Sequence, residues 1–373
     1  AGSEIARQAI GQRDASPASR TYSNDASQSQ HEWETAEGAP YGTRGGVSAL
    51  HSFPADGNYV FTLGFMSGWG ERFHDIDVSV DGEQVALLRY TASTGKLIDF
   101  QGRLGFPMQT DSIFVRAGQH RVTAAFIRQM DGPYEDLMRP NEWSLTGTEA
   151  SYGTTSLPHL MHMTVEGPHH PTGISETPTR QKVFVCRPTS RNEERPCAER
   201  IVSNLATQAY RRALEDRDVD ALMDFYDQGA ETGGFELGIR TVIEALLASP
   251  YFLFRIESAP SNAAPGEVFA VEGVDLASRL SFFLWGTSPD EQLLRVARSG
   301  ELSNLDGLER ETRRMLADAR SESLSTRFAH LWLRLQDLEK VQPDAFWFPN
   351  YSRQLARDMT RETELFFDNL VRE

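Results

Sequence analysis

The spacing of hydrophobic residues changes once along the chain, and this change limits the possible folds more than any other feature. Up to about residue 185, hydrophobic and polar residues alternate, as they do in residues 59–66 and 76–80. Beyond Pro196 the hydrophobic residues recur every three or four positions. Alternation is typical of strands with one buried face, and the longer period is typical of helices with one buried face. We therefore predict an α+β multidomain chain: an antiparallel β-sandwich, jelly-roll-like, followed by an all-α helical domain.

Composition shifts divide the chain further. Residues 1–40 are rich in Ser, Gln, Asp and Gly, which predicts an extended polar arm. Residues 41–185 hold the strand patterns, with Asp81-Gly82 as a hairpin turn. The helical patterns form a first segment at 186–258 and a second at 259–373, which begins with a linker rich in Pro, Ala, Ser and Asn. We expect the second segment to pack on the first.

The strongest helix pattern lies in residues 234–257. Ile239, Val242 and Leu246 fall on one face of a helix that Ser249-Pro250 ends. The run Tyr251-Phe252-Leu253-Phe254 follows, and so much hydrophobic surface in a short span predicts the centre of a helical core. The tryptophans at positions 285, 332 and 347 are candidates for core or interface positions.

The composition argues against some partners. The 373 residues are 39% hydrophobic and 24% charged, which is ordinary for a globular protein. The formal net charge of -16 argues against nucleic acid and against anionic membrane surfaces, because both favour a basic protein face. No hydrophobic run approaches the ~20 residues that a membrane-spanning helix needs.

The chain has two cysteines, Cys186 and Cys197, with ten residues between them in a polar segment that contains proline. A disulfide would close a short loop and add about 2–3 kcal/mol to stability in the chain-entropy model. It would also place the protein in an oxidising compartment. Two free thiols in a cytosolic protein are the alternative.

Several phrases of the chain resemble a family of large secreted multidomain proteins best known from planctomycetes and related bacteria. In the helical part these are CAERIVSNLATQAYRRALEDRDVDALMDFYDQG, GGFELGIRTVIEALLASPYFLFRIE, DLASRLSFFLWGTSPDEQLL, FAHLWLRLQDLEKVQPD and RETELFFDNLV. In the β part, GTRGGVSALHSFPADGNYVFTL and VDGEQVALL resemble the carbohydrate-binding-like sandwich of the same proteins. Those proteins are described as strings of numbered domains of unknown function, so the resemblance implies export without naming an activity.

Members of that family usually also carry Cys-x-x-Cys-His segments, which attach haem in c-type cytochromes. This chain has none, so the resemblance implies a redox setting but carries over neither haem nor a catalytic residue. We expect a binding protein more than an enzyme, and no cofactor in this chain, with calcium as the alternative.

Histidines and methionines alternate near the end of the β part. The residues are His159, Met161, His162, Met163, His169 and His170. Imidazole and thioether ligands together could hold copper or a haem iron. On a strand, however, His162 points away from the side of its two methionine neighbours, which favours methionine in the core and histidine outside.

Four acidic residues, Asp75, Asp77, Asp81 and Glu83, surround the predicted hairpin turn. They could supply oxygen ligands for calcium. Alternation places Asp75 and Asp77 on the solvent face, which is also where ordinary surface carboxylates lie.

Aromatic residues in loop-like stretches are the candidate contacts with a ligand or a partner. They are Trp69, Phe73, Tyr134 and Trp143. Such side chains can stack on a sugar or dock on a protein, and packing at the base of a loop is the alternative.

These observations give three functional hypotheses. The first is an exported, non-catalytic accessory subunit, periplasmic or extracellular and peripheral to a membrane. It would dock on protein subunits of a larger electron-transfer complex of the cytochrome or reaction-centre type. The second is a carbohydrate-binding module joined to a helical domain, acting in polysaccharide uptake or oxidation. The third is a fragment of a haem-containing oxidoreductase. Nucleic acid is not an expected partner.

Overall fold

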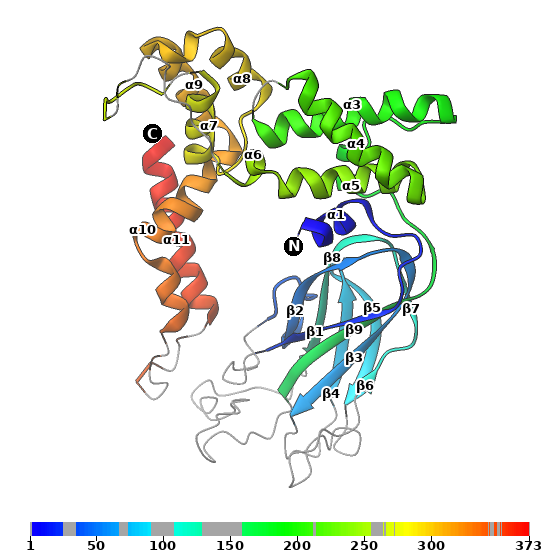
Figure 1. Cartoon of the computed structure of the whole chain (residues 1–373). Coiled ribbons are helices and arrows are strands. Elements are labelled where there is room, and N and C mark those ends of the chain that lie inside the picture. Colours follow the sequence, from blue (N-terminus) through cyan, green and yellow to red (C-terminus); the bar gives the residue numbers. More distant parts are fainter. Residues whose placement is uncertain are drawn as a thin grey trace. The chain divides into compact units, whose positions relative to one another are not determined.

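A computed structural model provides the structure of the chain (Figure 1). It describes residues 2–24, 35–66, 74–90, 108–128, 159–211, 214–254, 264, 266–271, 273–341, 343, 347–348, 351 and 353–372. The chain divides into a β unit, residues 7–180, and a helical unit, which combines residues 1–6 with residues 181–373. This order of elements confirms the predicted α+β class.

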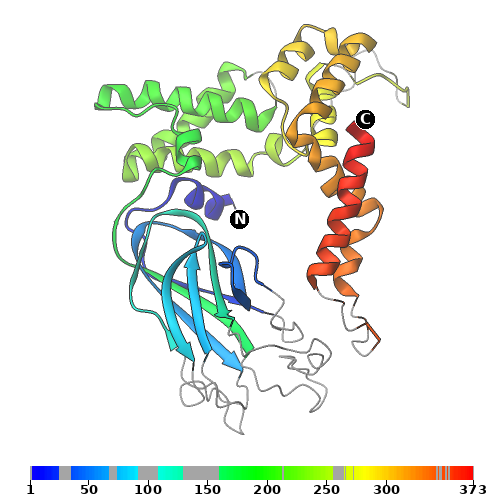
Figure 2. The ribbon, with the colours of Figure 1, turned by 180° about the vertical axis from the view of Figure 1, so that it is seen from behind.

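The β unit consists of two antiparallel sheets (Figures 1 and 2). The first sheet has the strand order β1-β9-β3-β6, and β7 also pairs with β3; the second has the order β2-β8-β4-β5. The strands are β1 (Ala18–Ser23), β2 (Thr43–Phe53), β3 (Asp56–Met66), β4 (His74–Val80), β5 (Glu83–Tyr90), β6 (Met108–Gln109), β7 (Ile113–Val115), β8 (Gly118–Ile127) and β9 (His159–Gly173).

The core of the sandwich lies between the sheets and is made by alternate residues of each strand. From the first sheet it takes Phe61, Leu63 and Phe65, and from the second Ile76, Val78 and Phe126, all fully buried. This is the expected result of period-two alternation, because successive side chains of a strand point to opposite faces.

The turn between β4 and β5 forms as its sequence predicts. Asp81 and Gly82 both have positive φ, 52° and 82°, as the two central residues of a type I′ turn require. Asp81 tolerates this conformation because one carboxylate oxygen accepts the backbone N–H of Arg121 at 2.8 Å.

Among the first 40 residues, the described residues 2–24 differ from the extended arm that the composition predicts. Residues 2–10 form helix α1 (Gly2–Ile10), and β1 pairs along its length with β9. Asn24, just after β1, donates side-chain hydrogen bonds to the carbonyls of Gly46 and Leu160. A polar composition therefore did not prevent this stretch from joining a sheet, because its backbone groups pair with β9.

The first helices of the helical unit pack side by side, and α3, α4 and α5 contact one another. The helices are α2 (Pro178–Val183), α3 (Arg191–Tyr210), α4 (Asp216–Gly233), α5 (Phe235–Ala248) and α6 (Pro250–Leu253). The predicted stripe of α5 is buried at Ile239, Val242 and Leu246. Ser249 ends α5, as the proline that follows it requires.

The later helices surround a second hydrophobic core that contains Trp285, Leu293 and Met315. The elements are α7 (Gly273–Leu284), α8 (Glu291–Arg298), η2 (Glu301–Ser303), α9 (Leu305–Ala317), η3 (Ala319–Ser321), η4 (Leu324–Ala329), α10 (His330–Trp332), η5 (Leu335–Lys340) and α11 (Arg353–Arg372). Asp290 is the N-cap of α8, and its Oδ1 accepts the Leu293 N–H at 2.9 Å.

Candidate functional site

Exposed aromatic side chains gather on the later helices of the helical unit. Phe283, Phe328 and Trp332 are 58%, 45% and 66% exposed, yet their rings contact one another in a row. The centroids of Phe283 and Phe328 are 6.1 Å apart, and those of Phe328 and Trp332 are 5.8 Å apart in a stacked arrangement. We call these three residues the aromatic face.

Helix α11 carries a second exposed hydrophobic surface. Leu355, Met359, Phe366 and Leu370 are 41% to 66% exposed. At 100° per residue they fall within an arc of about 60°, so they form one stripe. We call them the α11 stripe. The side of α11 next to this stripe, about 90° around the helix from its centre, packs inward: Phe367 contacts the core, and its ring lies 6.4 Å from the ring of Phe328. The same helix therefore supports the aromatic face and presents its own stripe.

A polar clamp holds these surfaces in place. Glu364, which is 8% exposed on α11, lies 3.0 Å from Nδ1 of His330 at the start of α10. Arg361 pairs with Glu364 at 3.4 Å and also with Glu322, just before η4. The π-helical turn η4 carries Phe328 between these contacts. Because both ends of the turn are anchored, the aromatic face is fixed before any partner binds.

Trp285 shows the contrasting, buried role of a tryptophan in the same segment. It is 3% exposed, its indole N–H donates to the Met315 carbonyl at 2.9 Å, and the guanidinium of Arg320 lies 3.5 Å from its ring centroid. Asp290 accepts from Arg314 at 2.9 Å. Burial raises the pKa of Asp290, but the hydrogen bonds from Arg314 and from the α8 backbone outweigh this and hold the pKa below its usual range. Trp285 and Asp290 both belong to WGTSPDEQLL, one of the sequence phrases that resemble the family, so this phrase has a structural role.

The run after α5 is not the centre of a core, contrary to the sequence prediction. Tyr251, Phe252, Leu253 and Phe254 are 37% to 63% exposed. Arg211 holds this segment through its guanidinium, which donates to the carbonyls of residues 251, 252 and 254 at 2.7 to 3.3 Å. Hydrophobic content alone did not reveal which side chains are covered. Trp332 and Trp347 are also exposed, at 66% and 73%.

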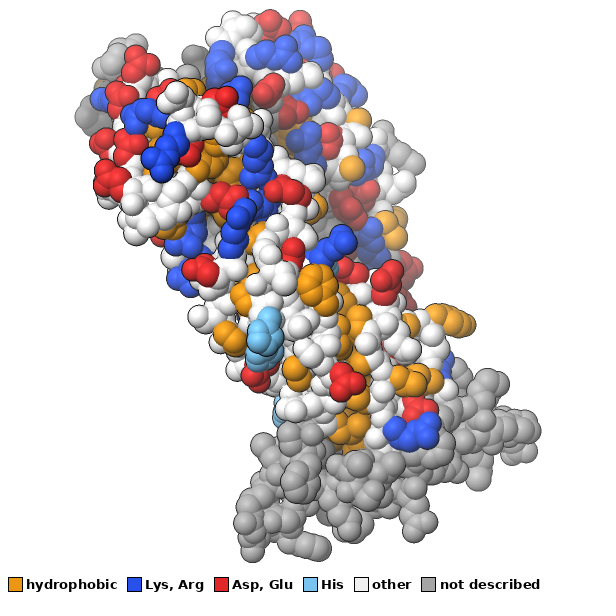
Figure 3. All heavy atoms as spheres, turned by 90° about the vertical axis from the view of Figure 1, so that its right-hand side faces the viewer, with side chains coloured by type: hydrophobic (Ala, Val, Ile, Leu, Met, Phe, Trp, Pro, Cys, Tyr) orange, Lys and Arg blue, Asp and Glu red, His pale blue; other side chains and the backbone are white. Residues whose placement is uncertain are grey.

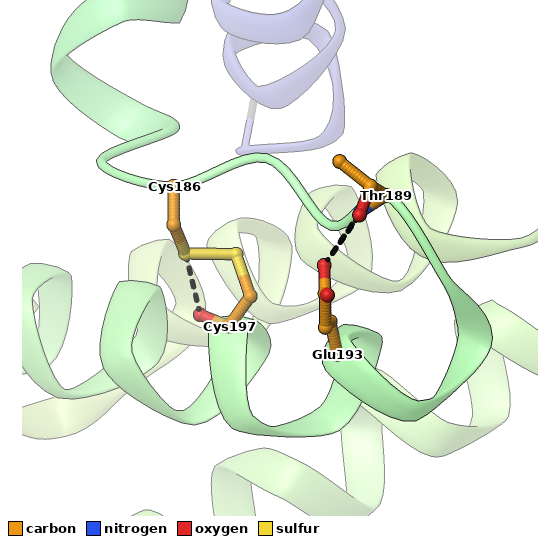
Figure 4. The surroundings of a disulfide bond; sticks show 4 residues. All are labelled: Cys186, Thr189, Glu193 and Cys197. Carbon is orange, nitrogen blue, oxygen red and sulfur yellow. Dashed lines mark hydrogen bonds between the residues drawn. A yellow bond between two sulfur atoms is a disulfide. The ribbon is translucent and has the colours of Figure 1, made fainter.

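The predicted disulfide between Cys186 and Cys197 is confirmed (Figure 4). Their Cα atoms are 6.0 Å apart, and the bond ties the segment after α2 to the second turn of α3. Glu193 closes the loop between the two cysteines. Its carboxylate accepts hydrogen bonds from the backbone N–H of Thr189 at 2.8 Å and from the Thr189 hydroxyl at 2.9 Å. These hydrogen bonds lower the pKa of Glu193. A disulfide fits an exported protein.

The predicted histidine and methionine site does not assemble. Met163 is fully buried, as predicted, whereas a bulge in the β3–β9 pairing leaves Met161 half-buried. In the register of β3 with β9, His162 lies opposite Gly64, on which its ring packs, and His169 lies opposite Asn58. The two histidines are therefore roughly 20 Å apart along the sheet. His169 instead lies 3.7 Å from Glu166, and His170 is exposed.

Within the described part of the chain, no group of three or more His, Cys, Asp or Glu side chains lies close enough together to hold a metal ion. The side chain of His159 lies outside the described residues.

The four acidic candidates have separate surroundings. Asp75 forms a two-point ion pair with Arg89 at 2.8 and 3.3 Å, Asp81 pairs with His120, and Glu83 is exposed. Burial raises the pKa of Asp81, but the hydrogen bonds from His120 and Arg121 outweigh it and lower the pKa. Asp77 lies on the outer face of the sheet, as alternation predicted, but it is only 3% exposed, so that face is covered there.

The aromatic candidates Trp69, Phe73, Tyr134 and Trp143 lie outside the described residues. The strand ends that flank their segments nevertheless converge. Met66 at the end of β3 pairs with His159 at the start of β9, and His74 at the start of β4 pairs with Tyr90 at the end of β5. The described strand ends on either side of these segments therefore lie at the same end of the sandwich (Figure 1).

Charged side chains of both signs are interspersed over the helices on the face drawn in Figure 3. Oppositely charged side chains of the helical unit also form surface pairs, as Arg195 and Asp227 do at 2.7 Å. No extended basic patch is visible on that face. None of the described helices has the length and hydrophobic character needed to cross a membrane.

Comparison with known proteins supports the resemblance stated from the sequence. Residues 197–257 match the family PSD5, protein of unknown function (DUF1595), and residues 271–373 match PSD4, protein of unknown function (DUF1592). Both matches lie in the helical unit, and both families are described as proteins of unknown function. A search of curated proteins finds no match.

Several solved structures are similar to part of the chain. The CBM36-1 domain of a multidomain xylanase from the hindgut metagenome of Trinervitermes trinervoides is 12% identical, with a TM-score of 0.24, and the match covers 40% of this chain and 97% of that domain. A family 35 carbohydrate binding module from Clostridium thermocellum is 14% identical, with a TM-score of 0.21, over 40% of this chain and 98% of that one. A Podospora anserina GH26-CBM35 mannanase is 10% identical, with a TM-score of 0.23, over 57% and 40%. The TM-scores are low, and the sandwich assignment depends on the pairing of the sheets themselves.

Proposed function

We propose that the chain is an exported accessory protein that docks on another protein through the aromatic face and the α11 stripe. The observation that carries this proposal is the exposure of Phe328 and Trp332 in a stacked, anchored pair. Contiguous exposed hydrophobic surface is uncommon on monomeric proteins and marks interaction sites. Aromatic side chains are also enriched at the centres of protein interfaces.

The size of the surface indicates that both parts are needed. An aromatic side chain buries 150–250 Å² when fully covered, so three half-exposed rings offer roughly 300 Å² and about 7 kcal/mol of hydrophobic free energy. Association costs an estimated 4–15 kcal/mol before any net affinity appears. The aromatic face alone would therefore bind weakly, and the α11 stripe supplies the remaining area. The clamp through Glu364 reduces the ordering cost, because the rings are already held.

The partner we consider first is a subunit of a membrane electron-transfer complex on its periplasmic or extracellular side. The disulfide supports export, and the family resemblance supports a redox setting. The chain would then act as a structural subunit, and its mixed surface charges would keep it from binding the anionic lipid directly.

The test is affinity purification of the tagged whole chain from native membranes. The wild type should retain membrane-complex subunits, and a Trp332→Ala/Phe366→Ala variant should lose them. Phe114→Ala is the matched control, since Phe114 is 56% exposed on β7 of the β unit. If the double variant keeps its melting temperature and retains the same subunits, or if the wild type purifies as a monomer without them, the proposal fails.

Carbohydrate binding by the sandwich is the second candidate. It is favoured by the position of the strand ends next to the segments that hold Trp69, Phe73, Tyr134 and Trp143, because these ends lie at one end of the sheets. Several aromatic residues within one set of loops can provide a stacking platform for sugar rings. Glycan-array binding that is lost in Trp69→Ala and Trp143→Ala, but retained in Trp332→Ala, would support this candidate. Absence of binding on a broad array would count against it.

A further inference from the structure

The outer face of the second sheet contains buried polar side chains, although alternation predicted that this face is exposed to solvent. Asp77 and Ser79 on β4 are 3% and 0% exposed, and Thr123 on β8 is 1% exposed. They point away from the core, because Ile76 and Val78 of the same strand face inward. Gln84 on the edge strand β5 completes the group, which we call the polar row.

The strand register brings the polar row together. Ser79 is paired with Thr123 on one side and with Gln84 on the other. Asp77 is two residues before Ser79 on the same face. Four oxygen-bearing side chains from three adjacent strands therefore lie within one patch of the sheet.

Asp77 lies in this patch without a cationic partner among the described residues. The Ser79 hydroxyl donates to its Oδ1, and the Gln84 amide donates to its Oδ2. The nearby cations are engaged elsewhere: Arg89 pairs with Asp75, and Arg121 pairs with Glu37 at 2.9 Å. Burying a carboxylate away from water is costly unless a positive charge compensates it.

Thr123 provides an independent observation. Its hydroxyl oxygen is buried and has no hydrogen-bond partner in the described structure. Buried polar atoms are almost always paired, so this hydroxyl is able to take one more ligand. By its register opposite Ser79, this oxygen lies on the same side of the sheet as Asp77.

The segment 35–40 runs over the neighbouring part of this face. The Ser48 hydroxyl donates to the Glu37 carbonyl at 2.6 Å, and a Cβ on Gly38 would meet the Arg121 side chain at 2.2 Å. Gln84 is exposed, so the other end of the polar row opens to solvent. The row is thus covered on one side and accessible on the other, as an ion-binding site needs.

We propose that the polar row binds a calcium ion. The ligands would be the Asp77 carboxylate, the hydroxyl oxygens of Ser79 and Thr123, and the Gln84 amide oxygen after a 180° rotation of its terminal group. All are hard oxygen donors, which calcium prefers. A single carboxylate contributes one negative charge to the site. Calcium sites with so little charge in extracellular proteins have dissociation constants of roughly 10⁻⁴–10⁻³ M. This inference does not depend on the docking proposal.

The test is thermal unfolding of the whole chain with EDTA, with 10 mM CaCl2 and with 10 mM MgCl2. For a millimolar site, calcium should raise the melting temperature of the β unit by about 3–6 °C, and magnesium should raise it clearly less. Thr123→Val should reduce the calcium response, and Asp77→Asn should abolish it. Asp75→Asn is the matched control, because Asp75 lies on the same strand and face but pairs with Arg89, and it should keep the full response.

Three results would overturn the site. They are no calcium response in the wild type, an equal response to magnesium, and an unchanged response in Asp77→Asn. If Asp77→Asn does not fold, the comparison of wild type, Thr123→Val and Asp75→Asn decides, and a full response in Thr123→Val then overturns the proposal.

Discussion

The hydroxyl of Tyr22 lies 2.8 Å from Nδ1 of His51, and this contact joins β1 of the first sheet to β2 of the second. His51 is 8% exposed and packs edge-on against Phe53. Burial, and secondarily the charge of Arg20, lower the pKa of His51 from 6.5 to about 4. A neutral imidazole is therefore part of the folded sandwich.

This contact predicts that the β unit loses stability in mild acid. The unfolded chain protonates His51 below about pH 6.5, whereas the folded chain resists until about pH 4, so stability falls as the pH decreases through this window. The loss should reach about 2 kcal/mol at pH 5. Urea unfolding at pH 7 and pH 5 measures it, and His51→Gln should remove most of the difference. Asp56 and Asp81, with lowered pKa values, act only below this window, near pH 4 and under. An equal pH dependence in His51→Gln would contradict the assignment.

The Asp290 network predicts a large difference between two acidic residues of the helical unit. Asp290 caps α8 and pairs with Arg314, with both side chains about one-quarter exposed, so Asp290→Ala should cost about 2 kcal/mol. Glu309 pairs with Arg313 on the surface, with exposures of 56% and 77%, and Glu309→Ala should cost below about 0.5 kcal/mol. Chemical unfolding of the two variants gives the comparison. Equal losses would mean that the Asp290 network contributes no more than a surface pair.

How far the sequence could predict the structure depends on whether a residue follows a simple burial rule. Alternation correctly located β3, β4 and the Asp81-Gly82 turn, because one face of each strand covers the core. It failed for Asp77, because periodicity identifies the outer face of a sheet but not what covers that face. The charge pattern gave no signal for His51 either, since its low exposure comes from a cross-sheet contact with Tyr22.

In the helical unit, too, the sequence predicted which residues share a face but not which hydrophobic residues are exposed. The period of α5 predicted its buried stripe, because regular spacing fixes which residues share a face. The run at residues 251–254 and Trp332 are equally hydrophobic but exposed, and hydrophobicity alone does not distinguish a core from a docking surface. The disulfide was predictable because its two cysteines are the only pair in the chain.

The disulfide gives a prediction confined to the helical unit, since both cysteines lie in it. Replacing both with serine should cost about 2–3 kcal/mol, because the crosslink limits the unfolded chain. Calorimetry should show the transition of the helical unit at a lower temperature and that of the β unit unchanged. Reduction of the wild type with dithiothreitol should reproduce the shift, and dithiothreitol should have no effect on the double variant. A shift of both transitions would show that the bond acts beyond its own unit.

The glycines around the start of β2 give a last prediction with a built-in control. Gly46, at φ 102° in the bulge between β2 and β8, leaves no room for a side chain: a Cβ would lie 2.2 Å from the Ala124 carbonyl oxygen and 2.8 Å from the Ala125 Cα. Backbone atoms cannot rotate aside, so Gly46→Ala should cost above about 3 kcal/mol or prevent folding of the sandwich. Gly42 has a similar φ of 87° but nothing within 4 Å of a Cβ, so Gly42→Ala should cost only the conformational penalty of about 1–2 kcal/mol. Thermal unfolding of both variants compares the stability lost through steric contact at Gly46 with the stability lost through backbone strain alone at Gly42. If Gly46→Ala is no worse than Gly42→Ala, the bulge is not the tightly packed element described here.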